Sequence, residues 1–296
     1  MIGESAFLAE ARRSFHAALM GRILTLDRKK VKGVEVDAWS NADGNNPASR
    51  EIAAGIASRI GEEVRGATLA GQMSGSQFEE ICRKYLEEVW ERLETIRPGN
   101  WRVEKGDLTI AEYDQYAHLK YLDELSRSNS QIAAALGSGY LIKPDVVMIR
   151  DPEEDEVLNN EGHLVDEEVA RHTGLRKING GKPLLHASVS CKWTIRSDRA
   201  QNARSEALNF VRNRKGHLPH IVVVTAEPLP SRISSLALGT GDIDCVYHFA
   251  LPELEETLEE LAASNHGYDD TASLLKMMVE GKRLKDISDL PLDLAA

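Results

Sequence analysis

Cysteine is scarce in this sequence, with only Cys82, Cys191 and Cys245 among 296 residues. The three are odd in number and far apart, which argues against both a disulfide framework and a zinc-binding spacing. We expect all three to be small buried residues of a protein from a reducing compartment.

Long apolar runs are also missing. No stretch approaches the roughly 20 residues that a membrane-spanning helix needs, so no membrane association is expected. Residues 1–5 lack a basic segment followed by an apolar one. A secretory signal is therefore not expected, and the predicted location is cytoplasmic.

Positive charge is in deficit, with 36 Lys and Arg against 47 Asp and Glu and a net charge of −11. The distribution of charge matters more than its sum for nucleic-acid binding. Residues 182–217 hold eight basic side chains and two acidic ones, a local net charge of +6. This local basic face can still engage phosphates, because salt screens charges beyond about 10 Å. Residues 151–168 hold nine carboxylates and no Lys or Arg, and we expect them to form a solvated surface.

Helical and strand patterns alternate along the chain, which indicates an α/β (α+β) protein. Apolar periodicity predicts helices at 6–26, 52–64, 76–97, 110–126, 132–136, 200–213, 253–263 and 271–280. Strands are predicted at 140–149, 184–195, 220–226 and 244–251, the third of them central and buried. The remaining expectations are a loop at 71–75 followed by a helix cap at Ser76, loops with at most one short helix at 151–181, and an irregular acidic tail after 280.

Several side chains with phosphodiester-cleaving chemistry lie at the ends of these elements. Asp145 opens an apolar run, and Ser190 and Lys192 are two apart in a strand, so they point the same way. Glu206 falls in the middle of a helix. Glu79 falls in the first turn of another predicted helix, where the helix dipole alone would favour a carboxylate. Carboxylates that hold Mg²⁺, together with a lysine that positions water, suit phosphodiester hydrolysis.

Pro144-Asp145, followed by Ser190-Cys191-Lys192, resembles the PD-(D/E)xK nuclease signature, except that Ser190 stands where Asp or Glu is expected. One branch of restriction endonucleases, which cleaves sites with a CCGG core, carries that carboxylate on the following helix. Glu206 fits that place. The chain resembles this branch over nearly its whole length, through the segments 40–44, 96–99, 134–138, 184–251 and 281–287.

The resemblance implies one domain with a central mixed β-sheet flanked by helices. The nuclease core would lie at about 136–252, between helical parts at about 1–135 and 253–296. It implies a type II restriction endonuclease that cuts GCCGGC in double-stranded DNA, with 5′-phosphate products, as a homotetramer that engages two sites. The implied catalytic residues are Glu79, Asp145, Lys192 and Glu206, with Ser190 in the same pocket and Mg²⁺ held by Asp145 and Glu206.

The segment Arg196-Ser197-Asp198-Arg199 has base-reading chemistry at a predicted helix start. Arg suits the two acceptors of guanine and Asp suits the amino group of cytosine, so the segment fits consecutive C·G pairs. Residue chemistry alone fits a surface salt-bridge cluster equally well. The resemblance favours base contacts to CCGG. It also implies that Asp43 and Gln72, by themselves an ordinary turn residue and loop residue, read the outer G·C pair.

Two other functions stay open from the sequence. A repair or nicking nuclease of the same fold would share the motif without making double-strand breaks at a fixed sequence. A sequence-specific DNA-binding protein without catalysis would account for Ser190 in place of an acid. Trp193, His186 and His220 are expected to pack in the interior or at a sheet edge rather than to bind ligands.

Overall fold

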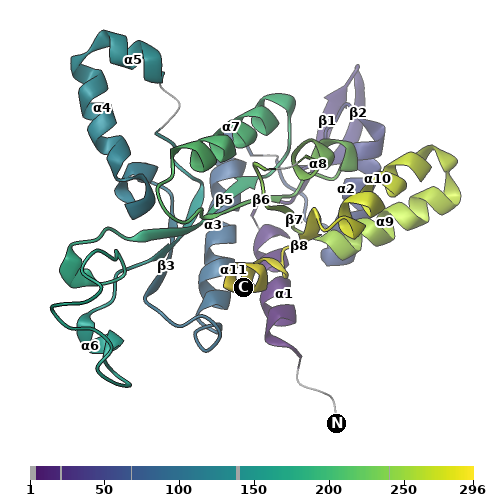
Figure 1. The fold of residues 1–296 in the computed structure, drawn as a ribbon. Helices are drawn as coiled ribbons and strands as arrows, with labels where there is room; N and C mark the ends of the chain where they lie inside the picture. The colour runs from purple at the N-terminus through teal and green to yellow at the C-terminus, as the bar shows by residue number, and fades with distance from the viewer. Residues whose placement is uncertain (1–4, 21, 68, 138–140, 240) are drawn as a thin grey trace.

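The computed structural model describes residues 5–20, 22–67, 69–137, 141–239 and 241–296. At its centre lies a sheet in the order β3-β4-β5-β6-β7-β8 (Figure 1). The strands are β3 (Trp101–Lys105), β4 (Val146–Arg150), β5 (Leu184–Lys192), β6 (His220–Thr225), β7 (Cys245–His248) and β8 (Leu284–Asp286). The pairs β3·β4 and β4·β5 are antiparallel, whereas β5 to β8 pair in parallel. The expected mixed central sheet is confirmed.

The central strands are buried because their sequences are continuously apolar. The residues from Val146 to Ile149 are at most 1% exposed, and Ile221 to Thr225 are at most 5% exposed. Strands covered on both faces need such runs. The strand predicted at 140–149 begins only at Val146. Its predicted first residue, Tyr140, lies outside the described residues.

Helices flank both faces of the sheet. They are α1 (Phe7–Met20), α2 (Pro47–Ile60), α3 (Gly71–Trp90), α4 (His118–Ser128), α5 (Ser130–Leu136), α6 (Asp155–Leu158), α7 (Ser197–Asn213), α8 (Pro230–Ala237), α9 (Leu251–Ser264), α10 (Asp269–Glu280) and α11 (Leu290–Ala295). Within the described ranges, none of these helices has the length and apolar character to cross a membrane.

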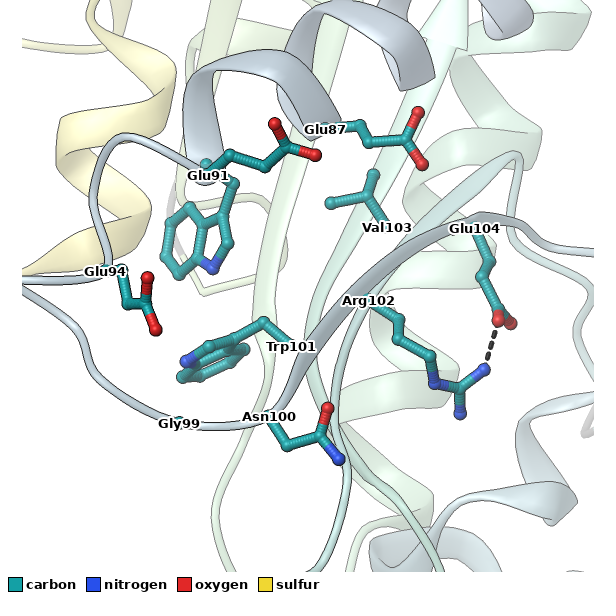
Figure 2. Close-up of a pocket in the computed structure, with 10 residues that line it drawn as sticks. Glu87, Glu91, Glu94, Gly99, Asn100, Trp101, Arg102, Val103 and Glu104 are labelled. Carbon is teal, nitrogen blue, oxygen red and sulfur yellow. Dashed lines mark hydrogen bonds and ion pairs between the residues drawn. The ribbon is translucent and has the colours of Figure 1, made fainter.

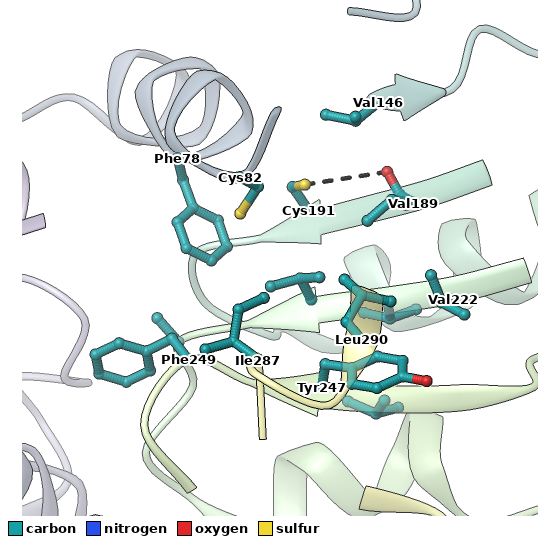
Figure 3. Packing of buried hydrophobic residues seen from close by; sticks show 14 of the residues in the cluster. Phe78, Cys82, Val146, Val189, Cys191, Val222, Tyr247, Phe249, Ile287 and Leu290 are labelled. Carbon is teal, nitrogen blue, oxygen red and sulfur yellow. Dashed lines mark hydrogen bonds between the residues drawn. The ribbon is translucent and has the colours of Figure 1, made fainter. Parts of the chain in front are cut away.

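Helix α3 packs on the face of the sheet to which Cys191 points. Phe78 and Cys82 of α3 lie beside Cys191 in the core (Figure 3). Consecutive residues of a strand point to opposite faces, so Lys192 points to the other side, which α7 covers (Figure 1). All three cysteines are buried free thiols, as predicted.

The start of α3 corrects one prediction. The helix begins at Gly71, so the predicted loop at 71–75 and the predicted cap at Ser76 are wrong. Two glycines in five residues suggest a loop, but the buried Ser74 donates a hydrogen bond to the carbonyl oxygen of Gly71 at 3.2 Å within the helix. Glu79 therefore lies well inside α3, and the helix dipole does not explain a carboxylate there.

The end of the chain corrects another. The segment after 280 is not an irregular tail, because β8 extends the sheet and α11 packs against the core. Leu290 and Leu294 are at most 1% exposed. His186 Nε2 lies 2.7 Å from the carbonyl oxygen of Leu294. The apolar residues of this segment are spaced among acids, so no window shows a clear period.

Three further features were not predicted. The strands β1 (Leu26–Val31) and β2 (Val34–Trp39) form an antiparallel hairpin whose turn places Lys32 and Gly33 at positive φ. The helix predicted to reach residue 26 ends at Met20, before this hairpin. Strand β3 and helix α8 are the other additions. Two short 3₁₀ helices, Ile110–Glu112 and Asp114–Tyr116, precede α4 where one continuous helix was expected.

The insertion at 151–181 consists mainly of loops, as predicted, with α6 and a 3₁₀ turn at Lys177–Asn179. Its acidic run is not entirely solvated. Glu153 is 7% exposed and Arg176 3% exposed, and the Arg176 guanidinium donates to Asp155 Oδ1 at 2.9 Å. The buried arginine neutralises part of the local negative charge.

Candidate active site and DNA interface

Asp145, which directly precedes β4, is the point where the predicted catalytic residues meet. Its Oδ2 accepts hydrogen bonds from Lys192 Nζ at 2.8 Å, from the backbone N–H of Cys191 at 2.8 Å and from Ser190 Oγ at 3.3 Å. The antiparallel pairing of β4 with β5 produces this arrangement, because Val146 lies opposite Val189.

Lys192 is held in its charged form. Burial alone would lower its pKa, but the negative charges of Asp145 and Glu206 outweigh burial, and the pKa is raised. The side chains of Lys192 and Asp145 are 17% and 23% exposed. Lys192 is thus an ammonium donor at neutral pH, with an open side toward solvent.

Glu206 on α7 and Glu79 on α3 complete the cluster. Burial raises the pKa of each, and the charge of Asp145 raises both further, while Lys192 acts in the opposite direction. Glu79 also lies 3.4 Å from Lys105 Nζ at the end of β3. The structure therefore brings Ser190 and Lys192 into hydrogen-bond contact with Asp145, and places Glu206 and Glu79 close enough for the charges of Asp145 and Lys192 to act on them.

The backbone around Asp145 is fixed by a close approach. The N–H of Gly106 donates to the carbonyl oxygen of Asp145 at 3.1 Å. A side chain at Gly106 would overlap the carbonyl oxygen of Pro144, so only glycine fits. This contact holds the Pro144-Asp145 turn against the end of β3.

The donor set can be compared with the needs of Mg²⁺. Among the described residues, no group of three or more His, Cys, Asp and Glu side chains is arranged to hold a metal ion by itself. Mg²⁺ commonly takes only one or two carboxylates and completes its shell with water and substrate phosphate. Asp145 and Glu206 are hard oxygen donors, and burial, with a smaller contribution from the charge of Asp145, raises the pKa of Glu206. A cation would offset both the burial and the repulsion. The residues present fit such an ion.

A cavity of about 630 Å³ adjoins this cluster along the chain, because Trp193 and Thr194, the residues after Lys192, line it. Three of the predicted base-reading residues also line it: Asp43, Arg196 and Arg199. The cavity is strongly cationic, with Lys29, Lys30, Arg196, Arg199 and Arg232 on its walls.

The segment Arg196–Arg199 enters helix α7, with Arg196 directly before it and Asp198 and Arg199 in its first turn. Arg196 and Asp198 are exposed. Arg199 Nη1 donates to the carbonyl oxygen of Thr194 at 3.3 Å. No ion pair joins Arg196, Asp198 and Arg199, all of which are described, so the alternative of a salt-bridge cluster is not what the structure has.

Asp43 lies in the loop after β2 and is paired with Arg232 of α8. Its carboxylate also accepts the N–H of Asn45 at 3.0 Å, the turn contact expected from sequence. Burial opposes ionisation, but Arg232, the Asn45 N–H and Arg196 together lower the pKa of Asp43. Arg232 was missed by sequence reasoning because it belongs to a helix that was not predicted.

Gln72 is placed differently from the other predicted reading residues. It is exposed in the first turn of α3 and does not line the cavity, although its neighbour Gly71 does. Gln72 is therefore next to a residue of the cavity wall but does not line the cavity itself, and its role in reading the outer base pair stays a prediction.

A second hollow, of about 470 Å³, lies beside the edge strand β3 (Figure 2). Its walls include Trp90, Trp101, Glu91 and the paired Arg102 and Glu104. None of the predicted site residues lines it.

The residues expected to pack do so. Trp193 is 3% exposed and meets the ring of Phe78 edge-on at 5.3 Å between centroids. His186 and His220 are partly buried at neighbouring strands, with ring centroids 5.0 Å apart.

A family model for the NgoMIV restriction enzyme matches residues 15–296. The chain belongs to this family. The type II restriction enzyme NgoMIV of Neisseria gonorrhoeae is 55% identical over 291 residues, which cover 97% of this chain and 98% of that protein. The chain is accordingly a restriction endonuclease, a DNA-binding hydrolase with site-specific deoxyribonuclease activity.

Solved structures give weaker matches. The type IIF restriction endonuclease Bse634I with cognate DNA has a TM-score of 0.35 at 13% identity, over 82% of this chain and 99% of that one. The PspGI–substrate DNA complex has a TM-score of 0.27 at 15% identity, over 97% of this chain and 89% of that one.

Proposed function

We propose that this restriction endonuclease is Mg²⁺-dependent and cleaves both strands of DNA at GCCGGC, leaving 5′-phosphates and 3′-hydroxyls. The convergence of Lys192 and Ser190 on one oxygen of Asp145 supports this most strongly, with Glu206 close by. Glu206 supplies the acid that Ser190 lacks, which argues against a protein that has lost catalysis.

The roles follow from the chemistry of each group. Asp145 and Glu206 would hold Mg²⁺, which when bound would activate water and offset the charge that develops on the phosphate. Lys192, kept as an ammonium, would orient the attacking water and donate a hydrogen bond to the phosphate. Glu79, partly buried beside Asp145, would accept a hydrogen bond from that water.

The reading roles are proposed from base chemistry and from the resemblance. Arg196, Asp198 and Arg199 would read the inner CCGG through the major groove, where Arg pairs with guanine and Asp with cytosine. Asp43 and Gln72 would read the outer G·C pair. The cationic cavity that Asp43 shares with Arg196 and Arg199 is consistent with one continuous recognition surface.

We also propose a cytoplasmic homotetramer, built from a single endonuclease domain per chain, that engages two DNA sites at once. A two-fold site is matched by two-fold protein symmetry. A plasmid with two GCCGGC sites should be cleaved faster than one with a single site, and sedimentation should give four chains per particle. Equal cleavage rates together with a dimeric particle would contradict the proposed tetramer, but not the proposed target site or chemistry.

The test of the site is incubation of the purified protein with plasmid and MgCl₂, followed by mapping of the fragment ends. We expect double-strand breaks at GCCGGC and no cleavage with EDTA. Nicked products without fixed ends would instead indicate a repair or nicking nuclease. Binding at GCCGGC without cleavage would indicate a DNA-binding protein.

Adjacent glutamates on α3 provide a matched control for the catalytic assignment. Glu79→Gln and Glu206→Gln should each slow cleavage at least about a hundredfold, as the loss of one transition-state contact does. Glu80→Gln should not, because Glu80 pairs with Arg83 instead. Full activity of Glu206→Gln would contradict the proposal that Glu206 takes the place of the acidic residue missing at position 190.

A further inference from the structure

Glu227 is a fully buried carboxylate, 0% exposed, two residues beyond the end of β6. Its Oε2 accepts the backbone N–H of Ile195 at 2.9 Å, and its Oε1 accepts that of Leu229 at 3.2 Å. The second contact is local and orders the start of α8. The first contact reaches Ile195, three residues beyond the end of β5, and fixes the residue directly before Arg196.

The same carboxylate also contacts Arg232, a residue of the cavity wall. Arg232 Nη1 lies 3.7 Å from Glu227 Oε2, and its other terminal nitrogen is bonded to Asp43. A continuous chain of polar contacts therefore runs from Ile195 through Glu227 and Arg232 to Asp43. It joins two segments that both line the cationic cavity.

The segment around Glu227 is tied to the catalytic strand as well. Thr225 Oγ1 donates to the carbonyl oxygen of Lys192 at 2.8 Å and accepts the N–H of Glu227 at 3.1 Å. Asn41, two residues before Asp43, donates to the carbonyl oxygen of Ala226 at 2.8 Å. Residues 225–227 thus hold the end of the catalytic strand, the inner reading segment and the outer loop in one register.

Burial of this carboxylate is costly. It raises the pKa of Glu227 to about 7, although the Ile195 N–H and Arg232 act in the opposite direction. Removing one partner of a buried polar contact leaves the other partners without compensation. For Glu227 those partners are two backbone N–H groups and the Arg232 guanidinium, so the carboxyl group orients all three together.

We propose that Glu227 is a positioning residue for sequence discrimination, which sets Arg196–Arg199 and Asp43 at a fixed separation so that the inner and outer base pairs are read together. This inference rests on the proposed reading function of those segments. Glu227 is buried and touches no DNA itself, so its effect is on the choice of sequence rather than on the chemical step.

The experiment compares Glu227→Gln with wild type. Glutamine keeps the size and one acceptor oxygen but cannot accept from both N–H groups while facing Arg232. The preferred site is first mapped with wild-type enzyme. Binding in Ca²⁺ and cleavage in Mg²⁺ are then measured on that site and on sites changed at the outermost pair. We expect discrimination at that pair to fall by about tenfold, the scale of one base contact.

Glu153→Gln is the matched control, since Glu153 is also buried and accepts a backbone N–H, that of Asn100 at 3.0 Å, but its ion-pair partner is Arg150, which does not line the cavity. It should leave discrimination unchanged. A folded Glu227→Gln protein with wild-type discrimination, or with an equal loss on every sequence, would overturn the proposal. If that variant unfolds, Glu227→Asp, which keeps the charge on a shorter arm, makes the same test with a smaller expected loss.

The two proposals fail in different ways. A mapped site other than GCCGGC would overturn the proposed target sequence. In that case the role of Glu227 is tested by the same measurement of discrimination, made at the outermost base pair of the sequence that the enzyme does prefer.

Discussion

At the scale of single residues, Asp145 is the centre of the cluster, because one of its oxygens accepts three hydrogen bonds. We expect Asp145→Asn to reduce single-turnover cleavage by at least about a hundredfold, since the neutral amide holds a cation more weakly than a carboxylate and cannot balance the charge of Lys192. DNA binding measured in Ca²⁺ should persist.

The variant's melting temperature separates the possible outcomes. Loss of binding together with a large fall in melting temperature would show that Asp145 braces β4 rather than the substrate. Ser190→Ala is a milder companion, because it removes one donor to Asp145 and leaves the carboxylate.

Arg199 allows a test of base reading against phosphate contact. It lines the cavity and is tethered to Thr194. Arg199→Ala should cost about 1–3 kcal/mol of discrimination at one base pair, seen as a ratio of cleavage rates on cognate and single-substituted sites. Arg212→Ala, near the far end of α7 and outside the cavity, should leave that ratio unchanged. A uniform loss for Arg199→Ala would mark it as a phosphate contact.

Residues with a motif were predictable, and residues defined only by contacts were not. Asp145, Ser190 and Lys192 share a recognisable spacing, and the structure places them at one point. Glu79 was given the wrong environment because the start of its helix was misplaced. Nothing in the sequence separates Arg232 or Glu227 from ordinary charged residues, because their partners are distant along the chain.

At the scale of elements, continuous apolar runs made β4 and β6 predictable, and α7 followed from its helical period. Strand β5 was also predicted, although polar residues interrupt its apolar ones. The hairpin β1–β2 and the edge strands β3 and β8 are short and rich in charge, and α11 is only six residues long. Their stability depends on pairing and packing with residues far away in sequence, a signal that local periodicity does not contain.

The hairpin carries a prediction of its own. Lys29 of β1 lines the cavity, and burial lowers its pKa although Asp27 and Asp43 oppose this. An ammonium there is well placed for a DNA phosphate. Lys29→Ala should weaken binding about equally for all sequences and reduce the slope of log affinity against log salt by about 1.

Lys32 at the hairpin tip is the control, because it is exposed and does not line the cavity. Lys32→Ala should keep the wild-type salt slope in the same titration. A loss for Lys29→Ala that depends on the base sequence would show instead that the hairpin reads bases.

At the scale of the whole molecule, the two ends of the chain close one core. Arg12 of α1 bonds both Glu253 of α9, at 2.7 Å, and Asp286 of β8, at 2.9 Å. The cluster of buried hydrophobic residues extends from Ala11 to Ala295.

Helix α11 allows a test of whether the C-terminal end of the chain belongs to this core. Leu294→Ala should destabilise the protein by about 2–5 kcal/mol, because Leu294 is 1% exposed and its loss leaves a cavity. Leu292→Ala, at 45% exposure on the same helix, should change stability by less than about 0.5 kcal/mol. Urea unfolding followed by tryptophan fluorescence measures both.

The shape of the transition matters as much as its midpoint. His186 of β5 contacts the backbone of Leu294, so α11 is joined to the central sheet rather than only to its neighbours. We therefore expect Leu294→Ala to shift one cooperative transition. A separate early transition, with the main one unmoved, would show that α11 melts on its own, and the C-terminal segment would then be an appendage to the core that holds the site.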